Sequence, residues 1–300
     1  MKKDLITLQD ITRDEVLNLF KKANLLKKKR EQGKPHKSLE GKSLGMIFSK
    51  ESTRTRISFE VGMYELGGQA IFLSSDQLQI KRDETAADSA KVLSRYLHGV
   101  VIRTHEHQFL EEFARYATIP VINGLTDLNH PVQILTDIFT IKEKLNKIDQ
   151  VKVAYIGDGN NVAYSWVLGA SLMNMHLSIA SPADLKPKIL GNFNESEKLS
   201  LIEDPIKAAK DADVIYTDVW VSMGDKEGDQ KKKQLKNYQI NQEILKVANP
   251  NALVMHCLPA HRDEEIASDV LDGPQSIIFD QAENRLHAEK ALMAYLLERA

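Results

Sequence analysis

Hydroxyl and guanidinium side chains gather in the string Ser52-Thr53-Arg54-Thr55-Arg56, between a predicted strand and a predicted helix. The first backbone N–H groups of a helix have no partner within the helix. Together with short hydroxyl donors and the bidentate guanidinium of Arg54, they can bind a phosphate. The same string could be an N-capping turn with two arginines in solvent, and by itself it favours neither interpretation.

Three other segments place polar groups at strand ends. Arg103 ends the apolar run GVVIRT, and ligands of open parallel sheets collect outside the carboxyl ends of strands. His130-Pro131-Val132-Gln133 presents an imidazole and a carboxamide at the start of a helix. His256-Cys257-Leu258-Pro259 ends a later strand. Alone, His130 is more often structural and Cys257 more often a small buried apolar residue. In combination with the phosphate string, these segments favour a binding cleft.

The segment GDGNN at 157–161 follows a strand and opens a helix, as in dinucleotide-binding proteins. It lacks the full G-x-G-x-x-G pattern, because position 162 is Val. Asparagines at a helix N-terminus better suit a small polar ligand such as an amino-acid carboxylate. Asp218, at the end of DVIYTDVW, could pair with a substrate ammonium or could simply form a turn.

Strand and helix patterns alternate along the whole chain, which predicts α/β architecture with parallel sheets covered on both faces. We expect two doubly wound domains of similar size, 1–134 and 135–282, with the C-terminal helix 283–300 packing back on the first. The charged, apolar-poor stretch 223–236 is typical of a mobile surface loop. Expected strands cover 42–48, 68–75, 99–104, 118–125, 152–159, 176–182, 213–220, 252–259 and 276–282.

Composition restricts the class of protein. The chain has 40 basic and 42 acidic residues among 300, and a net charge of −2 offers no overall field for nucleic acid or an anionic membrane. Its single cysteine excludes an internal disulfide and suits a reducing compartment. The N-terminus lacks the apolar stretch of a signal peptide, and no run is long enough to span a membrane. We therefore expect a soluble, cytoplasmic protein.

Four motifs in one chain, STRTR, HPVQ, DVWVSMG and HCLP, resemble those of the aspartate/ornithine carbamoyltransferase family. STRTR and HPxQ are shared by several carbamoyltransferases, whereas SMG and HCLP are similar to the ornithine-specific branch. The resemblance spans nearly the whole chain, from LITLQD to ENRLHAEKAL. It implies transfer of the carbamoyl group of carbamoyl phosphate to the side-chain amine of L-ornithine, which yields L-citrulline and phosphate in arginine metabolism.

The resemblance also implies roles for individual residues. The catalytic residues would be Arg103, His130, Cys257 and Thr55. The carbamoyl phosphate site would comprise Ser52, Thr53, Arg54, Thr55, Gln79, Arg103, His130, Pro131, Val132, Gln133, Cys257, Leu258 and Arg285, with Gln79 supplied by a neighbouring subunit. The ornithine site would comprise Asn161, Asp218, Ser222 and Met223.

Further expectations follow from the same resemblance. The first domain would bind carbamoyl phosphate and the second ornithine, in a homotrimer that sometimes assembles further, without a metal or organic cofactor. The Leu258-Pro259 peptide bond would be cis. From its charged composition, and from Ser222 and Met223 at its root, we further expect segment 223–236 to close over the bound substrates. A putrescine carbamoyltransferase is the nearest alternative. A nicotinamide-dependent dehydrogenase and a non-catalytic amino-acid-binding module are the alternatives from other classes.

Overall fold

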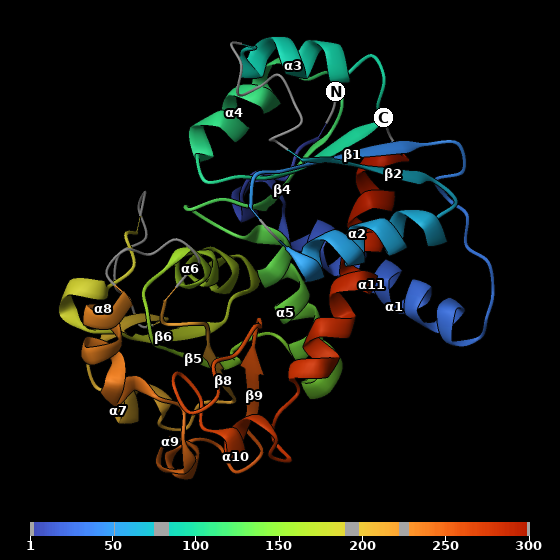
Figure 1. Cartoon of the computed structure of the whole chain (residues 1–300). Helices are drawn as coiled ribbons and strands as arrows, with labels where there is room; N and C mark the ends of the chain where they lie inside the picture. The colour runs from blue at the N-terminus through green and yellow to red at the C-terminus, as the bar shows by residue number, and fades with distance from the viewer. Residues whose placement is uncertain (1–2, 51, 75–83, 190–197, 222–227, 299–300) are drawn as a thin grey trace. The chain divides into compact units, whose positions relative to one another are not determined.

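The computed structural model describes residues 3–50, 52–74, 84–189, 198–221 and 228–298 (Figure 1). Its contacts divide the chain into two units. Unit 1 contains residues 1–139 and 283–300, and unit 2 contains residues 140–282. The first division lies between Phe139 and Thr140, inside a helix, whereas the sequence placed it after Ile134.

Unit 1 is built on a four-stranded parallel sheet with strand order β2-β1-β3-β4. Helices α3 and α4 lie on one face of this sheet, and α1, α2 and α11 lie on the other (Figure 1). The strands are β1 (Ser43–Phe48), β2 (Gln69–Ser74), β3 (Gly99–Arg103) and β4 (Val121–Leu125). The helices are η1 (Leu8–Asp10), α1 (Arg13–Glu31), α2 (Thr53–Glu65), α3 (Ala86–Leu93), α4 (His107–Tyr116), α5 (Pro131–Leu145) and α11 (Ile278–Leu297), the last two also entering unit 2.

Unit 2 is built on a five-stranded parallel sheet with strand order β7-β6-β5-β8-β9. One apolar core joins this sheet to α7, α8, α9 and α10, while α6 covers the other face (Figure 1). The strands are β5 (Lys152–Ile156), β6 (His176–Ala180), β7 (Leu199–Ile202), β8 (Val214–Thr217) and β9 (Leu253–His256). The helices are α6 (Asn161–Met173), η3 (Ala183–Leu185), α7 (Pro205–Ala209), α8 (Gly228–Leu235), η4 (Lys236–Tyr238), α9 (Gln242–Val247) and α10 (Ser268–Leu271).

Local signals account for many element boundaries. Thr12 and Glu15 form a capping box at the start of α1, in which each side chain accepts a hydrogen bond from the backbone N–H of the other residue. Asn160 caps α6 by accepting from two backbone N–H groups, and Asn174 ends this helix in the left-handed conformation. None of the helices in the described segments is long and apolar enough to cross a membrane.

Two sequence-based assignments were wrong. The run 276–282 is not a strand, because α11 already begins at Ile278 and only Ser276 makes a bridge to a strand residue. The stretch 223–236 is not all loop, because Gly228–Leu235 forms α8. Leu235 is fully buried and Lys231 Nζ lies 2.7 Å from Asp158 Oδ2, so tertiary contacts stabilise a helix that composition did not favour. The strand β7 was not anticipated.

Gly159 is required by close backbone packing. A Cβ atom there would lie 2.3 Å from both the carbonyl oxygen of Leu185 and the nitrogen of Pro187. Gly159 N also donates to Leu185 O at 2.9 Å. Close packing against another chain segment of unit 2 therefore explains the second glycine of GDGNN. No bound dinucleotide is needed to account for it.

We predict that Gly159→Ala lowers the free energy of unfolding by about 1–3 kcal/mol, because backbone atoms cannot move aside as flexible side chains can. Urea denaturation of the two proteins would measure this difference. Gly228→Ala is the matched control, since only side-chain atoms of Val221 lie near an added Cβ there, the nearest at 3.2 Å. It should change the free energy of unfolding by less than about 1 kcal/mol. Equal stability of Gly159→Ala and the original protein would contradict the packing argument.

His287, on α11, is 1% exposed, and its Nε2 lies 3.3 Å from Glu283 Oε1. Burial lowers the pKa of His287 to about 4, and Lys290 and Lys27 contribute in the same direction. The imidazole is therefore neutral in the folded protein at neutral pH. The unfolded chain binds a proton at a higher pH than the folded chain does.

We predict that this histidine makes the fold sensitive to acid. Above pH 6.5, the ordinary histidine value, His287 is neutral in both states and the free energy of unfolding is at its full value. As the pH falls from 6.5 toward 4, the unfolded chain takes up the proton first, so the free energy of unfolding decreases. His287→Gln should flatten the pH dependence of the unfolding free energy in that window. Denaturant titrations at several pH values would reveal this, and parallel curves for the two proteins would refute the assignment.

Candidate active site

The strand order of the first sheet reverses between β1 and β3. From β1 the chain proceeds to β2 on one side, and from β3 it proceeds to β4 on the other. Parallel sheets bind ligands at this switch point, beyond the carboxyl ends of the strands. The string Ser52 to Arg56 follows β1, and Arg103 is the last residue of β3, paired in register with Phe48 of β1. Two of the predicted site segments therefore meet at the switch point of unit 1.

The start of α2 is open to an anion. Ser52 is the N-cap residue, yet its side chain makes no capping bond, and the first turn contains no acidic residue. Thr53 is exposed, Arg54 is half-buried and Thr55 is 1% exposed. A helix of this length with uncapped N–H groups and a nearby guanidinium has the features of a phosphate site.

His130 is buried beside this helix start. Burial lowers the pKa of His130 well below the ordinary histidine value, and the guanidinium groups of Arg285, Arg103 and Arg54 lower it further. The imidazole is therefore neutral at physiological pH and donates one hydrogen bond. Pro131 and Val132 begin α5 and are buried.

Arg285, on α11, connects the predicted carbamoyl phosphate residues of unit 1. Its guanidinium donates to Gln133 Oε1, to Thr55 Oγ1 at 2.8 Å and, through Nε, to Glu289 Oε1 at 2.9 Å. Gln133 Nε2 in turn donates to Asp137 Oδ1 at 2.8 Å. These side chains are at most 3% exposed. A buried network therefore holds the amide of Gln133 and the hydroxyl of Thr55 in defined orientations.

Unit 2 has its own switch point, between β5 and β8. The GDGNN turn follows β5 and Asp218 follows β8. Asn160 Nδ2 donates to Asp218 Oδ2 at 2.8 Å, while its Oδ1 caps α6. Asn161, the first residue of α6, is half-buried beside it. Asn160 thus links the carboxylate of Asp218 to the first turn of α6.

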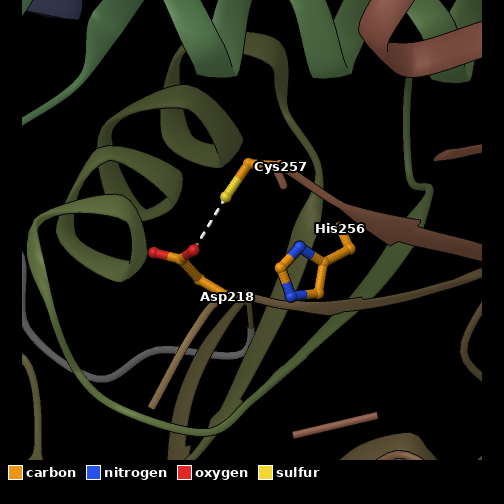
Figure 2. A group of neighbouring side chains, drawn as sticks. All are labelled: Asp218, His256 and Cys257. Carbon is orange, nitrogen blue, oxygen red and sulfur yellow. Dashed lines mark hydrogen bonds between the residues drawn. The ribbon is translucent and has the colours of Figure 1, made fainter. Parts of the chain in front are cut away.

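Cys257 and Asp218 lie in direct contact. Cys257 Sγ donates to Asp218 Oδ1 at 2.8 Å (Figure 2). The backbone N–H of Val219 donates to the same oxygen at 2.8 Å. Leu258 follows with φ +58°, and the Leu258-Pro259 peptide bond is cis, as predicted. Burial and the neighbouring acids raise the pKa of Tyr155 well above its usual value, and its hydroxyl donates to Asp158 O at 2.9 Å.

Asp218, His256 and Cys257 are close enough to suggest a metal centre. The hydrogen bonds of His256 argue against this interpretation. Its Nδ1 accepts from Leu258 N at 2.8 Å and its Nε2 lies 3.1 Å from the buried Glu265 Oε1, so both ring nitrogens are engaged. The group is better explained as a hydrogen-bonded support for the Cys257-Leu258 turn.

Not every predicted residue can be located. Gln79, Ser222 and Met223 lie outside the described residues. Sequence reasoning missed three residues that support the predicted ones: Asp137, Glu265 and Glu289. It offered the asparagines of GDGNN to a small polar ligand, whereas the structure shows Asn160 as the N-cap of α6, bonded to Asp218. The buried acids gave no sequence signal, because acidic residues are usually exposed.

Two family models match the chain. Residues 3–143 match the carbamoyl-P binding domain of aspartate/ornithine carbamoyltransferase, and residues 149–296 match the Asp/Orn binding domain. The ornithine carbamoyltransferase of Syntrophus aciditrophicus is 53% identical over 302 residues, which cover 99% of this chain and 100% of that protein. The anabolic ornithine carbamoyltransferase of Pyrococcus furiosus is 48% identical, over 98% and 96% of the two chains.

A solved structure agrees with these matches. The ornithine carbamoyltransferase from Pyrococcus furiosus superposes with a TM-score of 0.92 at 46% sequence identity, over 99% of this chain and 97% of that one. Full-length similarity of this degree, together with both family models and the strand-end groups of the two sheets, leads to one conclusion: the chain belongs to the aspartate/ornithine carbamoyltransferase family.

Proposed function

We propose that the protein is an ornithine carbamoyltransferase, which converts carbamoyl phosphate and L-ornithine to L-citrulline and phosphate. The proposal rests on the chemistry of the two switch points. In unit 1, cationic and neutral hydrogen-bond donors lie around His130, and in unit 2 the acid Asp218 lies at the switch point. The first set suits an anionic acyl phosphate. The second suits an amino acid with an ammonium group. Relatives with this name span the full chain.

In this proposal the start of α2 binds the phosphate. Backbone N–H groups, the hydroxyls of Ser52 and Thr53 and the guanidinium of Arg54 supply its donors. Arg103 reaches the phosphate from the neighbouring strand end. Gln133 holds the carbamoyl group through its oriented amide.

Attack on the carbamoyl carbon places negative charge on its oxygen. Arg103, Thr55 and His130 would stabilise that charge. His130 contributes as a neutral N–H donor, because its pKa is lowered by burial and by the arginines. Thr55 Oγ1 accepts from Arg285, which leaves its hydroxyl hydrogen for the substrate. Donors placed in advance for a developing oxyanion each contribute about 3–4 kcal/mol to catalysis.

The nucleophile is the δ-amine of ornithine, which like a lysine amine has a solution pKa of about 10.4. Only the neutral form attacks, and it is present at roughly one part in 10³ at neutral pH. The leaving phosphate can take up the proton as the tetrahedral intermediate collapses. We assign positioning and charge stabilisation, without a covalent enzyme intermediate, as the source of catalysis.

Asp218 is assigned to the α-ammonium of ornithine. A carboxylate accepts about four hydrogen bonds, and within the described part of the chain Asp218 accepts three, from Asn160, Val219 N and Cys257. We assign the fourth to an ammonium donor of the substrate. Asn161 would hold the α-carboxylate, with Ser222 and Met223 beside it. In this assignment Cys257, whose thiol donates to Asp218, would orient the amine, and Leu258 would contact the carbamoyl group.

Assembly is a prediction from the family resemblance, and location is a prediction from composition. We propose a homotrimer in which Gln79 of a neighbouring subunit completes the carbamoyl phosphate site, and a cytoplasmic location.

A direct assay of product tests the function. The purified protein should form citrulline from carbamoyl phosphate and ornithine, with far lower rates when putrescine or aspartate replaces ornithine. Putrescine lacks the α-carboxylate assigned to Asn161, and aspartate would place a second carboxylate near Asp218. A higher rate with putrescine than with ornithine would instead indicate a putrescine carbamoyltransferase. Absence of any carbamoyl transfer would refute the proposal.

We predict that Arg103→Ala lowers kcat by at least about 10², because it removes a charged donor to both the phosphate and the carbonyl oxygen. Steady-state kinetics of citrulline formation would measure the change. Arg115→Ala is the control, since Arg115 is an exposed arginine of the same unit on α4. A folded Arg103→Ala protein with ordinary turnover would contradict the assigned role.

A further inference from the structure

A buried acid on α11, Glu289, has no place in the reaction described above. It is 1% exposed, and burial raises the pKa of its carboxyl group. Its Oε1 accepts from Arg285 Nε at 2.9 Å and lies 2.8 Å from Arg285 Nη2. Its Oε2 bonds to the hydroxyl of Ser58, a residue of α2 that is 8% exposed. One carboxyl group therefore joins α11 to the helix that begins with the phosphate string.

The donors of Arg285 show what this carboxyl group does. Nη1 bonds to Gln133 Oε1, and Nη2 bonds to Thr55 Oγ1. A guanidinium is planar, so anchoring its Nε edge on one oxygen sets the direction of both Nη groups. Among the partners of Arg285 in the described residues, Glu289 is the only one that carries a charge. Without that anchor, the guanidinium could rotate away from Thr55 and Gln133.

Ser58 provides a second link. Its hydroxyl oxygen lies 2.6 Å from the carbonyl oxygen of Arg54 and within hydrogen-bond distance of Glu289 Oε2, and its single hydrogen can be donated to only one of these acceptors at a time. Glu289 thus reaches the first turn of α2 through Arg285, which donates to Thr55, and it contacts the same helix directly at Ser58.

We propose that Glu289 is a positioning residue for carbamoyl phosphate: it orients Arg285, and through Arg285 it sets the hydroxyl of Thr55 and the amide of Gln133. This inference rests on the proposed function of those residues. Glu289 itself does not touch substrate. It acts on one substrate only, because Thr55 and Gln133 both belong to the carbamoyl phosphate residues of unit 1.

Substitutions of Glu289 test whether this residue positions the carbamoyl phosphate residues or only stabilises the fold. Glu289→Ala removes both oxygens, whereas Glu289→Gln keeps the side-chain shape, an acceptor for Arg285 and a polar partner for Ser58. We expect Glu289→Ala to raise the KM for carbamoyl phosphate by at least about tenfold, equivalent to about 1.4 kcal/mol. The KM for ornithine should stay within about twofold, and Glu289→Gln should restore most of the loss. Glu298→Ala is the matched control, because Glu298 is an acid at the exposed end of the same chain segment, paired with Lys22.

A binding measurement keeps this test independent of turnover. Calorimetry with phosphonoacetamide, an unhydrolysable analogue in which a methylene replaces the bridging oxygen, should show the same ranking of the variants. If the original protein makes no citrulline, the proposed function fails, while a selective loss of analogue binding in Glu289→Ala would still support the positioning role.

Several results would overturn the inference. An unchanged KM for carbamoyl phosphate in Glu289→Ala would do so, as would equal increases in both KM values with a lower melting temperature. Should Glu289→Ala fail to fold, Glu289→Met keeps the length of the side chain and removes its oxygens. Failure of both to fold, beside an ordinary Glu289→Gln, would mean that Glu289 serves folding alone.

Discussion

Reversal of strand order at the centre of each parallel sheet is the constraint on which the rest of the structure depends. Where the chain turns to opposite sides from two adjacent strands, the connecting loops diverge and leave strand ends and helix starts uncovered. In unit 1 these are the ends of β1 and β3, and in unit 2 the ends of β5 and β8. The described residues that are assigned to substrate binding lie in three kinds of place. Some follow these strand ends, some follow the end of β9 beside β8, and the others lie on a helix of the same unit or just before one.

The two switch points carry opposite electrostatic character. In unit 1, burial and three guanidinium groups lower the pKa of His130, and the start of α2 carries no acidic residue in its first turn. In unit 2, burial and then Asp218 and Asp158 raise the pKa of Tyr155, and an asparagine, a backbone amide and a thiol donate to Asp218. An anionic acyl donor and a cationic amine acceptor would therefore be bound by different sheets.

Both sites depend on buried polar networks that lie behind the residues assigned to the substrates. Arg285, Glu289 and Asp137 fix Thr55 and Gln133, while Glu265 and His256 fix the turn at Leu258. Such networks are costly to leave incomplete, because each buried donor or acceptor lost is a desolvated group without a partner. They hold the reacting groups in place before substrate arrives, which is the condition for electrostatic catalysis.

The amino-acid sequence by itself determined the α/β class, most strand positions, the helix starts and the residues at strand ends, because alternation of apolar runs, caps and turns is a local property. It also carried the family motifs. Only the tertiary structure decided that 276–282 begins a helix, that Gly228–Leu235 is helical, and that Asn160, Glu265 and Glu289 support the site. Those outcomes depend on contacts between segments far apart in the chain, such as Ser58 with Glu289, and no local pattern records which buried acid will meet which arginine.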